Sequence, residues 1–344
     1  MSPNTYSNSR LFLGNKEIID FSNVSYKNTG KNKVSTLNIT ISDPEMDEFS
    51  LLGQEVVFYL NYGSNDNVPF FRGLVKQYTP SDKSLKIVAN DVLSLLAGTE
   101  SPPLTLTDDN NYDGFTIGQM LQDYIETVVN KNETKIGLDM LNDSNPPVTM
   151  TGYRNKSITP LKAVQSLLKS NKSSITDVKN TNLAVRDDGI KSNICFIEEQ
   201  DITNNGIKFS FNDGIEKLSW KKRPSPNFYK TSVNNNSMTY QHNTLPTGVV
   251  MGKLSGNFDF PDEAREEAFI DATQNEDKAE IKITVNKGHY LELGNVINLQ
   301  TPSHPKLTGK HRIVSKSVSA GKSIKCQLGL SKEAPQVSDY INNS

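Results

Sequence analysis

The sequence has little cysteine, with only Cys195 and Cys326 in 344 residues. Two cysteines cannot make the disulfide framework of a small secreted domain, so we expect folding in a reducing compartment. No apolar run approaches the roughly 20 residues that a membrane-spanning helix needs. The N-terminal segment also lacks the basic region and apolar core of a secretory signal. These absences predict a soluble protein with no membrane-spanning segment.

A charge excess of either sign is also missing. Lys and Arg total 37 and Asp and Glu total 39, which gives a formal net charge of -2. Proteins that bind nucleic acid or a membrane surface through electrostatics usually carry a clear basic bias. We therefore expect the main partners to be other proteins. The length allows several domains with cores of ordinary size.

Motifs of metal, phosphate and catalytic sites are incomplete. The four histidines form no HExxH or i, i+4 pair, and two cysteines do not complete a zinc set. "DDNNYDGF" at 108–115 begins like a calcium loop, but Met120 stands at the twelfth position, where a bidentate Glu is needed. "SAGKS" lacks the first glycine of a phosphate-binding loop, because that position is Lys316. We predict no metal, no cofactor and no enzyme activity.

Two features touch on carbohydrate chemistry. "EEQD" at 198–201 could supply an acid pair for sugar hydrolysis, but an acidic cluster between a strand and a polar "TNNG" is more typical of a solvated turn. The single tryptophan, Trp220, is expected to be a core anchor, because a stacking platform would need several aromatic residues in a row.

Strands dominate the first hundred residues. "IIDFSNVSY", "KVSTLNITIS" and "QEVVFYLNY" alternate apolar and polar side chains, and polar turn segments separate them. This period of two, with short spacings, predicts antiparallel strands in a barrel or a sandwich.

The middle of the chain changes period. In "TIGQMLQDYIETVVN" at 116–130, apolar residues recur at three and four, which predicts a helix with Thr116 and Gln119 as its capping box. "SITPLKAVQSLL" predicts a second helix, with Thr159 at the cap and Pro160 in the first turn. "LAVRDDG" and "ICFIEE" are expected strands of a small mixed α/β unit. "PDEAREEAFIDATQNED" predicts a third helix with a thin alanine stripe.

A hairpin pattern occurs twice. "FFRGLVKQYTPSDKSLKIVAND" at 70–91 and "KHRIVSKSVSAGKSIKCQLGLS" at 310–331 both place an Arg four residues before a Lys and then a Ser-apolar-Lys string. Upstream, "IIDFSNV" is matched by "IEKLSWK", and "KVSTLNI" by "NFYKTSV". The shared order predicts a duplicated β-unit whose second copy is interrupted at roughly 234–280.

The predicted fold class is α+β, mainly β. The expected domains are a first β-barrel at 1–98, a helical and mixed α/β region at 99–205, a second β-barrel from 206–235 and 280–334, an insertion with a helix at 236–279, and a C-terminal tail at 335–344.

The order of these elements carries a family resemblance. "GQEV" at 53–56, "FRGLV" at 71–75 and "IVANDVLSLL" at 87–96 resemble the first domain of late-control-D-type tail proteins, the baseplate hubs of contractile phage tails and related injection systems. "LELGNVINL" and "GKHRIVSKSVS" are similar to the family's last domain, and "SITPLKAVQSLL" fits its helical middle. The resemblance spans nearly the whole chain. It implies two similar tail-tube-like antiparallel β-barrels with helical and mixed α/β insertions.

The same resemblance implies a function. Three chains would form a homotrimer whose six barrels surround a channel and join the hexameric tail tube to the trimeric central spike. The implied partners are the tail tube protein, the central spike protein, other baseplate proteins, and the tape-measure protein and DNA that pass through the channel. The implied location is the virion tail baseplate, assembled in the host cytoplasm. The alternative is a tail-tip protein with cell-wall hydrolase or carbohydrate-binding activity.

Charges at matched positions of the two copies are the candidate site residues. They would form rings of quasi-six-fold symmetry that face either the lumen or the tube, where acidic side chains or DNA phosphates could pair with them. Simple solvent exposure is the competing interpretation, since charged strand residues are usually exposed. The candidates are Arg72 with Arg312, Lys76 with Lys316, and Lys86 with Lys325.

Overall fold

The computed structural model is mainly β with few helices, as the sequence predicts. The chain divides into two compact units, one of Met1–Asp201, Val285–Asn295 and Val314–Leu328 and the other of Ile202–Thr284, Val296–Ile313 and Gly329–Ser344. The described residues are 9–30, 32–42, 51–60, 68–97, 104–105, 112, 114–132, 138–141, 157–170, 181–198, 207–210, 214–222, 228–241, 251–258, 261–262, 264–265, 268, 279–286, 288–320 and 324–331.

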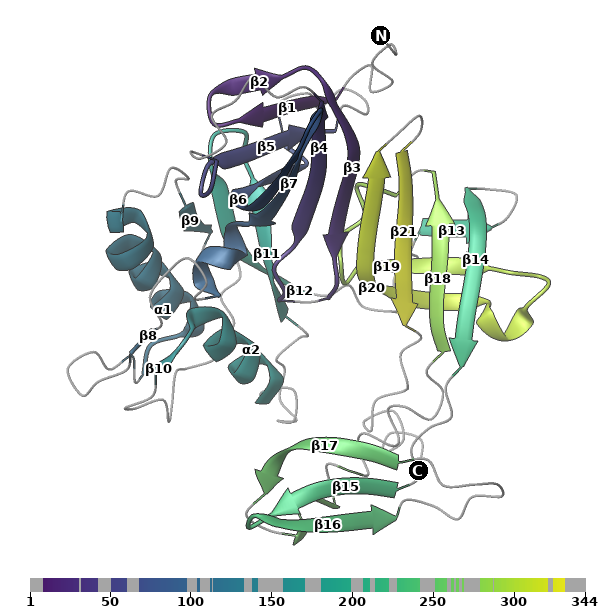
Figure 1. The fold of residues 1–344 in the computed structure, drawn as a ribbon. Helices are drawn as coiled ribbons and strands as arrows, with labels where there is room; N and C mark the ends of the chain where they lie inside the picture. The colour runs from purple at the N-terminus through teal and green to yellow at the C-terminus, as the bar shows by residue number, and fades with distance from the viewer. Residues whose placement is uncertain are drawn as a thin grey trace. The chain divides into compact units, whose positions relative to one another are not determined.

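A curved antiparallel sheet begins the first unit (Figure 1). Its strand order is β3-β4-β7-β6-β5-β1-β2. The bounds are β1 Arg10–Leu13, β2 Lys16–Ile18, β3 Phe21–Asn28, β4 Thr36–Ser42, β5 Glu55–Tyr59, β6 Phe71–Ser81 and β7 Ser84–Asp91. Ile39 lies opposite Ile87 in the register of β4 and β7, and both are buried. The period of two thus places one apolar face in a core, while the opposite face is polar on β4 and β7 and carries apolar side chains such as Val57 on β5.

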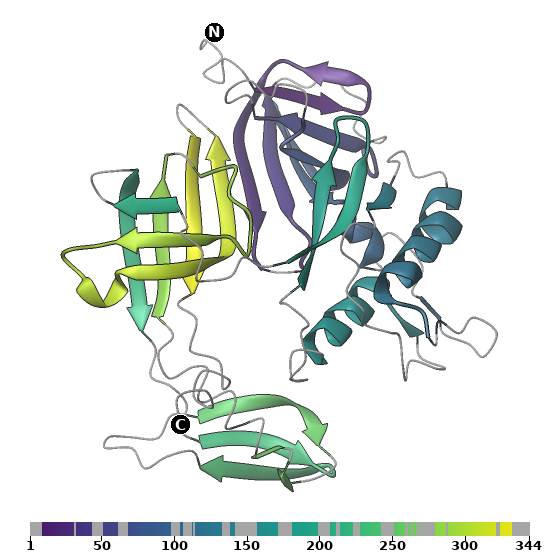
Figure 2. The ribbon, with the colours of Figure 1, turned by 180° about the vertical axis from the view of Figure 1, so that it is seen from behind.

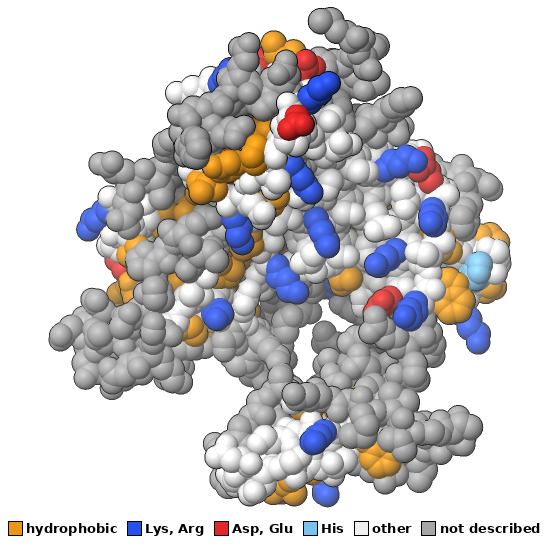
Figure 3. Space-filling view, in the orientation of Figure 1, with side chains coloured by type: hydrophobic (Ala, Val, Ile, Leu, Met, Phe, Trp, Pro, Cys, Tyr) orange, Lys and Arg blue, Asp and Glu red, His pale blue; other side chains and the backbone are white. Residues whose placement is uncertain are grey.

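The outer face of this sheet is polar over β3, β4 and β7. Figure 3 shows Lys and Arg side chains lying singly over these strands, with uncharged side chains between them. Lys86 on β7 belongs to this exposed face, while its neighbours Leu85 and Ile87 are buried. Charged residues on a solvated sheet face cost little, so their presence alone does not mark a site.

A second group of strands has the same order. Its bounds are β14 Ile215–Lys222, β18 Ala279–Val285, β19 Val296–Gln300, β20 Gly309–Ala320 and β21 Ile324–Ser331. The order is β14-β18-β21-β20, with β19 on β20. We call β3 to β7 the first five-strand set and β14 with β18 to β21 the second. If the strands of each set are numbered along the chain, their order in the sheet is first, second, fifth, fourth, third in both sets.

The turns before the third strands match as well. Gly53 has φ +73° and Gly294 has φ +89°, a left-handed conformation that glycine adopts without strain. Gln54 N–H donates to the Leu51 carbonyl at 3.0 Å, and Asn295 N–H donates to the Glu292 carbonyl at 3.2 Å. The shared order and the shared turn support the duplication inferred from the sequence.

Two of the sequence matches are wrong in detail. "NFYKTSV" is β15 (Phe228–Val233), which pairs with β16 (Asn236–Gln241) and β17 (Met251–Phe258) in a separate sheet, so the counterpart of β4 is β18. The match of "IIDFSNV" to "IEKLSWK" begins too early. Ile18 belongs to β2, and β3, the counterpart of β14, starts at Phe21. Alternation reports that a segment is a strand but not which strand it joins.

One position differs between the sets. β13 (Ile207–Ser210) lies on β19 and runs parallel to it, whereas β1 lies on β5 and runs antiparallel.

The helices follow the sequence closely. α1 (Ile117–Tyr124) has the expected capping box: Gln119 N–H donates to Thr116 Oγ1 at 3.2 Å, and Thr116 N–H donates to Gln119 Oε1 at 2.9 Å. The helix continues as a π-helical turn, Ile125–Val129, and a 3₁₀ turn, Asn130–Asn132. α2 (Pro160–Ser170) begins with Pro160, and Thr159 Oγ1 accepts from Lys162 N–H at 3.4 Å.

Small strands and a 3₁₀ turn complete this middle region. β11 (Thr181–Asp187) pairs antiparallel with β12 (Ser192–Glu198), as predicted, and β9 (Leu138–Leu141) adds a parallel strand. β8 (Leu104–Thr105) pairs with β10 (Ser157–Ile158). Asp91 caps the turn η2 (Val92–Leu96), whose side chains join the core under the helices. Figure 2 shows the β11–β12 hairpin beside the first five-strand set.

The third predicted helix is described only in part. Residues 261–262, 264–265 and 268 are helical, and Ala264 and Ala268 are buried. Within the described ranges, no helix combines the length and apolar character needed to cross a bilayer.

Gly73 is a packing constraint in the repeated hairpin. A Cβ built on Gly73 would lie 2.0 Å from the Asn90 carbonyl oxygen on β7, closer than real Cβ atoms come to backbone. We predict that Gly73→Ala lowers the free energy of unfolding by at least about 2 kcal/mol, because the hairpin must open to accept the methyl group. Urea unfolding measures this. Thr79→Ala, exposed on the same strand, is the control and should stay within about 0.5 kcal/mol of the parent.

Candidate functional site

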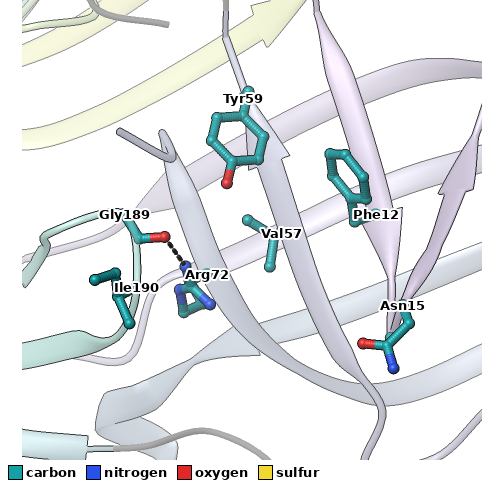
Figure 4. A pocket seen from close by; sticks show the side chains of 8 residues that line it. Phe12, Asn15, Val57, Tyr59, Arg72, Gly189 and Ile190 are labelled. Atoms are coloured by element: carbon teal, nitrogen blue, oxygen red, sulfur yellow. Dashed lines mark hydrogen bonds between the residues drawn. The ribbon is translucent and has the colours of Figure 1, made fainter. Parts of the chain in front are cut away.

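A pocket of about 320 Å³ lies in the first unit where the β11–β12 turn meets β1, β5 and β6. Figure 4 shows Arg72 and Ile190 on one side of it and Phe12 on the other. The lining residues are Phe12, Gly14, Asn15, Val57, Tyr59, Arg72, Gly189 and Ile190. The walls are therefore mainly apolar side chains and backbone, with one guanidinium.

That guanidinium makes four hydrogen bonds to acceptors of the same unit. Arg72 Nη1 donates to Glu55 Oε1 at 2.6 Å, and Nε donates to Asp187 Oδ2. Nη2 donates to the Gly189 carbonyl at 3.2 Å, the bond drawn in Figure 4, and to Asp187 Oδ1 at 3.4 Å. Arg72 therefore joins β6 to β5 and to the end of β11.

The ion pairs of Arg72 are largely shielded from solvent. The side chain of Arg72 is 9% exposed and that of Asp187 is 7% exposed. Burial lowers the pKa of Arg72, but the hydrogen bonds that it donates to Asp187 and Glu55 outweigh this effect, so its pKa is raised overall. Two carboxylates already neutralise the guanidinium, so a ligand anion would have to displace one of them. The arrangement favours a structural clamp over an anion-binding site.

The β11–β12 turn is held by its own aspartates. Asp187 Oδ1 accepts from Gly189 N–H at 2.8 Å, and Gly189 has φ +92°. Asp188 Oδ1 accepts from Ile190 N–H at 2.9 Å and from Lys191 N–H at 2.8 Å. These bonds lower the pKa of Asp188 to about 2. The "DDG" of the sequence thus forms a rigid tip that presents Ile190, which is 86% exposed, to solvent.

The charged groups of this region are paired with one another. Among the described residues, no group of three or more His, Cys, Asp or Glu could hold a metal ion. Glu55 and Asp187 lie against a cation and not against an open cavity. Neither residue stood out in the sequence, because an ion pair that spans 115 positions leaves no local pattern.

The predicted charge pairs have different environments. Arg72 and Arg312 are both buried, the latter at 5% exposure. Lys86 and Lys325 are both exposed on the last strands of their sets. Lys76 is exposed on β6, whereas its partner Lys316 on β20 is buried. The six candidate residues therefore do not form one continuous charged surface. Their role in a ring or tube interface stays a prediction.

Lys316 is held by backbone oxygens. Its Nζ donates to the carbonyls of His289 and Leu291, the latter at 2.7 Å, and lies 5.5 Å from the ring centroid of Phe70. Burial lowers the pKa of Lys316. Burial, with Lys316 nearby, also lowers the pKa of His289. Lys316 thus acts as a structural contact inside the first unit.

Trp220 differs from the expectation of a core anchor. It is 50% exposed on β14 and makes an edge contact with the ring of His304, with centroids 6.2 Å apart. Of the "EEQD" and calcium-like segments, Glu199, Asp201, Asp109, Asn111 and Asp113 lie outside the described residues.

No protein-family model and no curated protein matches the sequence. Solved structures do match its fold. The tail protein from Neisseria meningitidis MC58 has a TM-score of 0.60 at 12% identity, over 94% of this chain and 96% of that one. The chain has the fold of a phage tail protein.

Two further structures agree with this fold. The prophage MuSo2 43 kDa tail protein from Shewanella oneidensis has a TM-score of 0.60 at 10% identity, over 94% of this chain and 97% of that one. The E. coli c3393 protein, described as a type VI secretion component similar in structure to the T4 bacteriophage tail proteins gp27 and gp5, has a TM-score of 0.56 at 12% identity. That match covers 95% of this chain and 77% of the other.

Removing the cation of the clamp should be costly. We predict that Arg72→Ala lowers the free energy of unfolding by about 3 kcal/mol, because Asp187 is left buried without its counter-charge. Chemical denaturation measures the loss. Arg10→Ala is the matched control, since Arg10 pairs with Glu17 on an exposed surface and should have almost no effect. Equal losses for the two variants would contradict the assignment of a clamp.

Acid should loosen the β11–β12 turn. The pKa of Asp188 falls from 3.8 to about 2 on folding. A lowered folded pKa adds stability that is present above 3.8 and lost as the pH falls through about 2. We predict that Asp188→Asn flattens the dependence of stability on pH in this window. Denaturation at a series of pH values from 5 to about 2 measures it, and an unchanged slope would contradict the prediction.

Proposed function

We propose that the protein is a non-enzymatic structural hub of a phage or phage-like tail baseplate. Three chains form a ring of quasi-six-fold symmetry that joins a hexameric tail tube to a trimeric central spike and leaves a channel for the tape-measure protein and DNA. The proposed partners are the tube protein, the spike protein and neighbouring baseplate proteins, and the proposed location is the virion tail.

One observation carries this proposal: the same five-strand order occurs twice in the chain. A chain with two similar sets is suited to a place where three-fold and six-fold symmetry meet, because three copies supply six equivalent positions. The tail-protein fold of the chain, which extends over 94% of its length in two comparisons, supports a tail-related structural role.

The charges that remain exposed refine the ring hypothesis. Lys86 and Lys325 occupy matched strands and both reach solvent, so they are the pair best placed to form a repeated charge ring in an assembly. Arg72, Arg312 and Lys316 are buried and contribute through packing and internal bonds.

The oligomeric state tests the proposal directly. We predict that the purified protein sediments at three times its 38.2 kDa mass at sufficient concentration. Analytical ultracentrifugation over a concentration series measures this. A monomer or a dimer at every concentration, with no ring by negative-stain microscopy, would contradict a self-assembling hub.

A further inference from the structure

Apolar side chains lie on the outer face of the first sheet, away from its core. Phe12 on β1 lies opposite Val57 on β5, and Val57 lies opposite Arg72 on β6, so these residues form a row across the sheet. Tyr59 shares this face, because alternate residues of β5 point to the same side. Phe12, Val57 and Tyr59 do not belong to the core cluster beneath the sheet. Packing of that core therefore does not account for them.

The same three side chains line the pocket of about 320 Å³, and its aromatic rings are held in place. The rings of Phe12 and Tyr59 meet edge to face with centroids 5.8 Å apart. The Arg10 guanidinium, which pairs with Glu17, lies 4.8 Å from the Phe12 centroid. Val57 is 6% exposed at the base of the pocket, and Figure 4 shows the Tyr59 hydroxyl directed toward it. The pocket thus has a fixed aromatic wall.

Hydrogen-bonding groups of both kinds surround this wall. Gly14 and Asn15 form the two-residue turn between β1 and β2, with Gly14 at φ +56°, and the turn places Asn15 at the rim. Gly189 of the β11–β12 turn lies across the pocket from Asn15. The Asn15 amide and the Tyr59 hydroxyl both donate and accept hydrogen bonds, whereas the Gly189 carbonyl accepts them.

Arg72 adds a donor to the pocket without making it cationic. Its four hydrogen bonds to Glu55, Asp187 and Gly189 leave at least one of the five guanidinium N–H groups without an acceptor in the part of the chain that the structure describes. Two carboxylates and one guanidinium give this group a formal charge of -1. The charge disfavours anions, and the remaining N–H suits a neutral oxygen atom.

We propose that this pocket binds one neutral sugar ring in the pyranose form. The C–H groups on one face of the ring pack against Phe12 and Tyr59. The hydroxyls bond to the Asn15 amide and to the remaining N–H of Arg72, and each hydroxyl can donate and accept at once. The pocket volume lies at the lower end of the range for small-molecule sites, which suits a single ring. This inference goes beyond the structural hub and does not depend on a trimer.

An apolar side chain of a partner protein is the competing occupant. It would fill the space beside Val57 and contact the aromatic wall. It would also cover the Asn15 amide and the remaining N–H of Arg72 without bonding to them, and covering a polar group without a partner is unfavourable. The mixed lining therefore favours a ligand that carries hydroxyls around an apolar face.

Saturation-transfer NMR on the full chain tests the binding. The probes are the methyl pyranosides of glucose, galactose and mannose, together with N-acetylglucosamine. We expect saturation transfer to at least one of them, with a dissociation constant on the order of 1 mM for a ligand of this size. The matching uronic acid, in which a carboxylate replaces the hydroxymethyl group, is the charged comparison and should bind more weakly.

Three substitutions locate the binding. Tyr59→Phe removes one hydroxyl, Phe12→Leu removes an aromatic face and keeps an apolar side chain, and Asn15→Ala removes an amide from an exposed turn. Each should weaken binding about fivefold, as expected for one lost contact. Tyr78→Phe is the matched control, since Tyr78 is a half-buried tyrosine of the same sheet outside the pocket, and it should bind like the parent. Thermal melting checks that each variant folds.

The outcomes separate this inference from the proposed function. The absence of saturation transfer to every neutral probe would overturn the sugar site, and so would binding that all three pocket variants leave unchanged. Equal affinity for the uronic acid and its neutral parent would overturn the assignment of a neutral ligand. A trimer in sedimentation that binds no sugar would overturn this inference alone. Sugar binding by a protein that stays monomeric would support it and contradict only the hub.

Discussion

The hydrogen-bonding requirement of strand edges governs this structure. Backbone N–H and C=O groups need partners wherever water is excluded, and a strand in a sheet must find them on both sides. β20 meets this requirement by pairing first with β19 and then with β3, so one long strand has two successive partners. What the chain repeats is therefore an order of strand pairing. The similar residues of the two hairpins are a small part of that repeat.

Much of the fold was predictable because its signals are local. The capping box of Thr116 and Gln119, and the proline that opens α2, depend on residues within one turn. Alternation located the strands for the same reason.

What could not be predicted depends on contacts between distant segments. Nothing in "NFYKTSV" indicates that β15 joins β16 and β17 and not the second five-strand set. In the sequence, Arg72 and Lys86 are both charged residues of a predicted strand. In the structure, Arg72 is covered and pairs with Asp187, whereas Lys86 is exposed to solvent. Lys76 and Lys316 share a sequence context, yet Lys76 is exposed at a register shift of β6 and Lys316 is buried on β20. At the candidate site, the sequence named Arg72 but neither of its partners, Glu55 and Asp187.

The parallel strand β13 has a consequence for how the two sets can be told apart. β1 enters its place beside β5 from one end of the sheet, whereas β13 enters the same place beside β19 from the opposite end. The first residues of β1 and β13 therefore lie at opposite ends of otherwise similar sets. In the proposed ring, the first and second five-strand sets alternate, so the shape of the rim would alternate too. A partner with three-fold symmetry could contact one kind of set alone. A partner with six-fold symmetry could contact only the features that both sets share.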